Sequence, residues 1–129
     1  MISNPAAVLV AAIAAVVFAA VYYSMLAGTA ARFSAAWADQ GRSPARVLAF
    51  ELVKSVVLAL VVAWLVHAVG IADVAGALGL AVALWIAFPV LLLAGSVVHE
   101  KVAWQLAGIH AVEWLAKLAI IGLVVTIWA

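Results

Sequence analysis

Five ionisable residues lie within stretches of the sequence that are otherwise apolar. Glu51 and Lys54 are three positions apart, and Glu113 and Lys117 are four positions apart with the glutamate first. On a helix these spacings bring the opposite charges of each pair side by side. His110 precedes Glu113 by three positions and therefore shares its helical face. Such groups either form ion pairs that hold helices together or relay protons and ions.

The composition of the chain indicates that these charges are surrounded by a membrane. Of the 129 residues, 72% are hydrophobic and 9% are charged, and the mean hydropathy is +1.40. A soluble domain is usually about half apolar and about a quarter charged, so this chain lacks the polar residues that cover a globular surface. These values exclude a soluble enzyme, a disordered protein and a nucleic-acid-binding protein, and the net charge of +1 agrees. The remaining class is an integral membrane protein, whose main partner is the lipid bilayer.

Four apolar segments predict an all-α bundle of four transmembrane helices in a single domain, residues 1–129. The expected spans are about 5–28, 45–69, 74–98 and 108–128. Asn4 followed by Pro5 is typical of the start of a helix, and Gly70 is typical of the residue after a helix end. Pro89 lies in the middle of the third span and predicts a kink there, because proline removes one backbone hydrogen bond.

The length of the chain fixes the depth of the second charged pair. Only twelve residues follow Lys117, which is about 18 Å of helix, whereas the hydrocarbon core is about 30 Å thick. The fourth span must therefore begin near residues 107–109. Consequently His110, Glu113 and Lys117 are expected to lie within the membrane.

The four charges are expected at a similar depth, because the second and fourth helices start on the same side of the membrane. A charged group near the bilayer centre costs about 2.5–3.5 kcal/mol, and such groups normally face the bundle interior and pair with one another. We expect one polar cluster, between these two helices or across a subunit interface, formed by Glu51, Lys54, His110, Glu113 and Lys117. The spacing allows pairing within each helix, and across the helices it also allows Glu51 to meet Lys117 and Glu113 to meet Lys54.

The basic residues predict the orientation of the chain. Arg32, Arg42 and Arg46 flank the first connection and Lys101 lies in the third, whereas the second connection has only Asp73. By the positive-inside rule the first and third connections are cytoplasmic, and both termini face outward. The expected location is the bacterial inner (cytoplasmic) membrane, which the chain crosses several times.

Two further patterns concern packing and the membrane surface. Small residues repeat at close to four-residue spacing and predict packing faces on two helices. They are Ala7, Ala11, Ala15 and Ala19 in the first span, and Ala72, Gly76, Gly79 and Ala83 in the third. Phe33 and Trp37 lie four positions apart and predict a short interfacial helix after the first span.

The residues typical of an enzyme, a metal site or a cofactor site do not occur in a suitable pattern. The chain has no cysteine, which excludes thiolate ligands and cysteine nucleophiles. His67 and His99 fall on opposite sides of the predicted membrane, and His110 with Glu113 is a single pair without a second one to match it. We therefore expect no metal, no cofactor and no enzymatic activity.

Short motifs in the first and third spans resemble those of DUF1761, a family of bacterial four-helix membrane proteins of unknown function. In that family the first span ends in an aromatic-Tyr-Ser stretch, followed by Leu-Phe-Gly-Lys and a tryptophan. Residues 22–29 (YYSMLAGT) match the first part, other residues replace the phenylalanine and lysine, and Trp37 comes late. Trp85 and Phe88 are similar to the family's Trp-x-x-Phe. The resemblance implies four helices with both termini on one side, over nearly the whole chain. It implies no activity and no functional residues.

Two kinds of function agree with these observations. The first is a small structural or accessory membrane protein, in which the intramembrane ion pairs lock the helices together. The alternative is a small transporter or channel, coupled to protons or ions, that uses the cluster in the second and fourth helices. Four helices leave little room for an internal pathway, so we expect a homo-oligomer or another membrane protein as partner.

Overall fold

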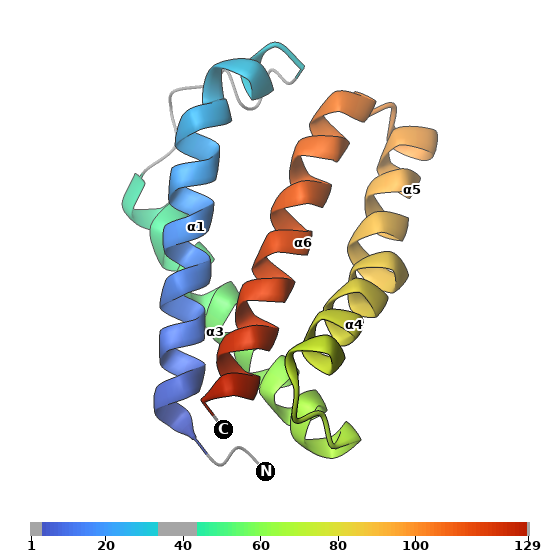
Figure 1. The fold of residues 1–129 in the computed structure, drawn as a ribbon. Helices are drawn as coiled ribbons and strands as arrows, with labels where there is room; N and C mark the ends of the chain where they lie inside the picture. Colours follow the sequence, from blue (N-terminus) through green and yellow to red (C-terminus); the bar gives the residue numbers. More distant parts are fainter. Residues whose placement is uncertain (1–3, 34–43, 129) are drawn as a thin grey trace.

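The computed structural model describes residues 4–33 and 44–128, whose helices are drawn in Figure 1. Within these residues four helices are long and apolar enough to cross a membrane. They are α1 (Pro5–Ala31), α3 (Pro44–Val69), a third helix composed of α4 (Val74–Trp85), η1 (Ile86–Val90) and α5 (Leu91–Glu100), and α6 (Trp104–Ile127). The predicted class, an all-α membrane bundle with four spans, is confirmed.

The signals for helix ends are explained by local hydrogen bonding. The Asn4 side chain accepts a hydrogen bond from the backbone N–H of Ala7 over 3.2 Å, and so caps α1. Gly70 has a φ of 80°, the left-handed conformation that ends a helix and that glycine adopts without strain.

Helix α6 begins at Trp104 rather than near residue 108. The helix therefore begins about one turn before the predicted start, because the thickness of the hydrocarbon core sets only a minimum length for a spanning helix.

The predicted kink around Pro89 takes the form of a π-helical segment, η1. Proline has no amide hydrogen and its ring clashes with a carbonyl one turn earlier. A wider turn relieves this clash, and single π-turns inside α-helices are the usual form of such a widening. The indole Nε1 of Trp85, just before η1, donates a hydrogen bond to the carbonyl of Ala111 over 2.8 Å. This bond ties the widened region to α6.

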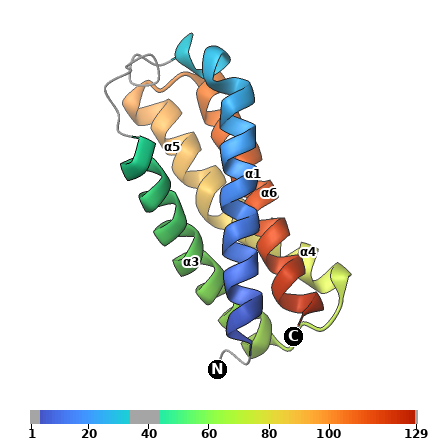
Figure 2. The ribbon, with the colours of Figure 1, turned by 90° about the vertical axis from the view of Figure 1, so that its left-hand side faces the viewer.

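Helix α6 lies at the centre of the bundle and packs against α1, α3, α4 and α5. In Figure 1 it runs between α1 on one side and the α4–α5 helix on the other, and Figure 2 shows α3 beside α1. The chain ends lie together, since the Asn4 side-chain amide donates a hydrogen bond to the carbonyl of Trp128 over 2.9 Å. The termini of the described chain are therefore on one side of the bundle.

Small residues form the packing face of α1 as predicted, but the prediction for the third helix was wrong. The alanines of the α1 repeat are all buried; they are Ala7, Ala11, Ala15 and Ala19. On α4 the buried residues are Ala77 and Ala81 instead. A Cβ added to Gly122 of α6 would lie 3.5 Å from the carbonyl oxygen of Ala77, so the two backbones approach closely there. In an alanine-rich helix several small-residue faces coexist, and the position of Gly122 selects one. The predicted interfacial helix of Phe33 and Trp37 extends outside the described residues.

Candidate functional site

The four intramembrane charges form one continuous network of ion pairs between α3 and α6. Glu51 Oε1 lies 2.6 Å from Lys54 Nζ, and Glu51 Oε2 lies 3.2 Å from Lys117 Nζ. Lys117 Nζ in turn lies 2.8 Å from Glu113 Oε1. The order Lys54–Glu51–Lys117–Glu113 alternates in sign, so each inner group touches two opposite charges. The contact between Glu51 and Lys117 is the one that joins the two helices.

The two ends of this network differ in burial. The side chains of Lys117 and Glu113 are 0% and 2% exposed, whereas those of Glu51 and Lys54 are 21% and 31% exposed. Removing two charges from water is costly unless they are paired, which explains why the buried lysine lies between two carboxylates. Among the described residues Glu113 Oε1 accepts no hydrogen bond, although Lys117 Nζ is close by. The Oε1 atom is held instead by its 2.8 Å ion pair with Lys117.

Trp114 adds an aromatic surface to the charges. The Nζ atoms of Lys54 and Lys117 lie 5.5 Å and 5.1 Å from the centre of its indole ring. An ammonium group within about 6 Å of a tryptophan ring is attracted by its π electrons. The position of Trp114 beside Glu113 and three residues before Lys117 was the only sequence signal for this role.

The fifth predicted residue, His110, is connected to α1. Its Nδ1 lies 2.6 Å from the hydroxyl oxygen of Tyr23, within hydrogen-bond distance. The neighbouring Tyr22 hydroxyl donates to the carbonyl of Ile109 over 2.8 Å. Sequence reasoning did not identify Tyr23, although a tyrosine hydroxyl near the end of an apolar helix needs a partner when buried.

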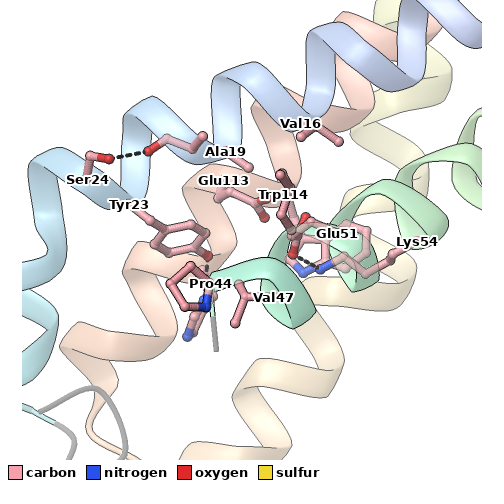
Figure 3. A pocket seen from close by; sticks show the side chains of 13 residues that line it. Val16, Ala19, Tyr23, Ser24, Pro44, Val47, Glu51, Lys54, Glu113 and Trp114 are labelled. Carbon is pink, nitrogen blue, oxygen red and sulfur yellow. Dashed lines mark hydrogen bonds and ion pairs between the residues drawn. The ribbon is translucent and has the colours of Figure 1, made fainter. Parts of the chain in front are cut away.

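A cavity of about 640 Å³ lies between α1, α3 and α6, beside the charged network (Figure 3). Glu51, Lys54, His110 and Glu113 contribute to its wall, together with Tyr23. The rest of the lining comes from apolar and small residues, namely Val16, Ala19, Ala20, Ser24, Pro44, Val47, Leu48 and Trp114. The wall of the cavity therefore contains two carboxylates, one ammonium group and one imidazole, of which Glu113 is almost fully buried.

The predicted residues are thus brought together with one difference in their pairing. Glu51 meets Lys117 across the helices, but the ion pairs of the described residues do not include one between Glu113 and Lys54. The reason is local, since each of these two side chains turns to an opposite charge on its own helix, one turn away. Among the described residues there is also no group of three or more histidine, cysteine, aspartate or glutamate side chains arranged to hold a metal ion.

Comparison with known proteins identifies a family but gives no activity. The family model described as "Protein of unknown function (DUF1761)" matches residues 6–126, which include the five residues of the cluster. Searches among curated proteins and among solved structures found no match. Because the family model covers nearly the whole chain, this protein belongs to the DUF1761 family.

Proposed function

We propose that this protein binds a small solute in the cavity between α1, α3 and α6 and carries it across the membrane, coupled to protons. The observation that supports the proposal is the position of the charges: Glu51, Lys54, His110 and Glu113 line a cavity of about 640 Å³. Protein interiors are normally close-packed. A network that only locks helices together needs no space of this size beside it.

The arrangement suggests how a proton affects the bundle. Glu51 binds Lys54 with one oxygen and Lys117 with the other. A proton taken up by this carboxylate removes its negative charge and weakens both contacts. Because the contact with Lys117 joins α3 to α6, the two helices are then free to separate locally. Loss of the proton restores the pair, so uptake and release of one proton alternate between two packing states.

A structural or accessory role is the second candidate, and the charge balance supports it. Two glutamates and two lysines neutralise one another, and the inner pair is almost completely buried. In this case the ion pairs serve to fix the register of α3 on α6, as buried polar groups do in some helical assemblies. The cavity would then have no ligand.

Proton flux in reconstituted vesicles distinguishes the two candidates. The protein is incorporated into vesicles containing a pH-sensitive dye, and small amines, carboxylates and neutral solutes are added in turn. We expect at least one of these three classes of solute to drive proton movement into or out of the vesicles. Ala20→Phe, which fills the cavity, should abolish it, whereas Ala27→Phe, at an exposed site on the same helix outside the cavity lining, should not. If no class moves protons more than in empty vesicles, the structural role is supported and the transport proposal is rejected.

The remaining parts of the proposal concern the setting of the protein. We place it in the bacterial inner membrane, with the termini outside, because Arg32 and Arg46 flank the first connection. We also propose a homo-oligomer without enzymatic activity. The helix formed by α4 and α5 is the least buried of the four spans and offers the largest surface for a second copy. Measurement of the mass of the purified protein in a nanodisc tests the oligomer.

A further inference from the structure

An apolar groove adjoins the polar cavity. It has a volume of about 800 Å³ and lies between α3, α6 and the third helix around η1. Its walls are formed by aliphatic and aromatic side chains, which are Leu58, Val61, Val62, Leu65, Leu84, Phe88, Pro89, Leu92, Leu93, Trp114 and Leu118. A groove of this composition accommodates a hydrocarbon group and offers little to a polar solute.

The groove and the cavity share one wall residue, Trp114. On α3 the transition takes one helical turn, from Lys54 in the cavity to Leu58 in the groove. On α6 it takes one turn as well, from Trp114 to Leu118. Polar and apolar binding surfaces therefore follow each other along the same pair of helices.

The polar part of this site is built to hold an ammonium group. The Nζ of Lys54 lies 2.6 Å from Glu51 Oε1 and 5.5 Å from the centre of the Trp114 ring. A carboxylate next to an aromatic face is the combination that binds organic cations. Glu113 adds a second carboxylate to the cavity wall. The shape and charge of the wall thus suit a cation.

We infer that the solute is an amphipathic organic monocation, with its ammonium group in the cavity and its hydrocarbon part in the groove. The inference rests on the proposed function, whose solute it identifies by class. It requires that the ammonium group of Lys54 move away from Glu51 when the ligand binds. The side chain of Lys54 is 31% exposed, whereas that of Lys117 is fully buried. Lys54 can therefore turn toward water along its flexible stem.

This exchange keeps the charge of the site unchanged. Glu51 and Glu113 are balanced by Lys117 and by one further ammonium group, which is Lys54 in the empty site. When the ligand's ammonium group takes that position, the buried charges still sum to zero. An anion would add an unbalanced negative charge beside two carboxylates, which is unfavourable in a medium of low dielectric constant.

Equilibrium binding to the protein in phosphatidylcholine nanodiscs tests the inference. The probes are octylammonium, octanoate and octanol, which share one tail and differ in charge, with empty nanodiscs subtracted. We expect octylammonium alone to bind. Glu51→Gln should weaken its binding about tenfold or more, as expected for the loss of a hydrogen bond to a charged group. Lys54→Gln should strengthen binding by about threefold, because it removes a competitor in a partly exposed ion pair.

In a binding site the two variants change the affinity for octylammonium in opposite directions. If Glu51 and Lys54 formed only a structural ion pair, both variants would change this affinity in the same direction. The double variant Glu51→Gln/Lys54→Gln keeps the site neutral and serves where the single glutamate variant does not fold. It should bind octylammonium as weakly as Glu51→Gln.

The groove is tested with Val61→Trp, which narrows it, and with Val57→Trp as the control at an exposed position outside the groove lining. Only the first should weaken octylammonium binding. Binding of octanoate or octanol instead would overturn the inference but leave transport itself possible. Displacement of octylammonium by phosphatidylethanolamine would assign the site to a lipid headgroup and would also overturn it.

Discussion

Glu51 of α3 and Lys117 of α6 are joined by a 3.2 Å ion pair between residues 66 positions apart in the chain. The ammonium group of Lys117 has no exposed surface, and it lies between the carboxylates of Glu51 and Glu113. It is thus the centre of the charged network, while Lys54 is the outer member that borders the cavity. This difference in position leads to different expectations for the two lysines.

Removal of Lys117 should destabilise the protein strongly. Lys117→Met leaves the buried carboxylate of Glu113 without its counter-charge, and breaking a buried ion pair in this way costs about 3–5 kcal/mol. Thermal unfolding in detergent, followed by circular dichroism, should show a large decrease in the midpoint. The double variant Lys117→Met/Glu113→Gln should recover much of the loss, since no buried charge is left without a partner. A double variant no more stable than the single one would contradict this account.

The hydrogen bond between Tyr23 and His110 should be detectable at the imidazole. Tyr23→Phe removes the hydroxyl that lies 2.6 Å from Nδ1, at a cost in stability of about 1 kcal/mol. The ¹⁵N chemical shifts of His110 should change in this variant. Tyr22→Phe is the matched control, because that hydroxyl binds the carbonyl of Ile109. Equal shifts in both variants would show that Tyr23 does not act on the ring directly.

The close approach of α4 and α6 should make Gly122 sensitive to large side chains. A single Cβ there lies 3.5 Å from Ala77 O, an ordinary contact, so Gly122→Ala should be tolerated. Gly122→Leu forces the helices apart and should cost about 1–3 kcal/mol by overpacking. Gly108 is on the same helix and a Cβ there meets nothing within 4 Å. Gly108→Leu should therefore leave the unfolding midpoint nearly unchanged, and an equal loss in both leucine variants would refute the packing argument.

The proposed orientation can be read from the labelling of single cysteines, since the natural chain has none. Asp73→Cys lies in the connection between α3 and α4, and Lys101→Cys lies between α5 and α6. In intact cells a membrane-impermeant maleimide should label position 73 and leave position 101 unlabelled. The reverse pattern would invert the proposed topology without changing the fold.

The fold could be predicted largely from hydropathy, because the length of each apolar run fixes the number of spans. Pro89 marked the site of a helix irregularity, but the extra turn width at η1 depends on how the chain around it packs on α6. The packing face of α4 could not be chosen from sequence, since alanine and glycine occur on more than one face. The face that is used contacts another helix, α6, where Gly122 lies close to Ala77.

The charged residues of the candidate site were identifiable because charge is rare and costly in a membrane. Tyr23 and Trp114 were not identified, because both act through neighbours that are assembled by packing. The cavity was equally inaccessible to sequence reasoning, since its volume depends on the angles between α1, α3 and α6.

The central claim is that the cavity beside Glu51 and Glu113 is open to water and solutes, and labelling of two adjacent residues tests it most directly. Val16 lines the cavity, whereas Val17 is exposed on α1 outside the cavity lining. The two differ in depth by about 1.5 Å. A membrane-impermeant, positively charged thiosulfonate should modify Val16→Cys rapidly and leave Val17→Cys unmodified. If both cysteines remain unmodified, the cluster is dry, and its role is to hold α3 and α6 together.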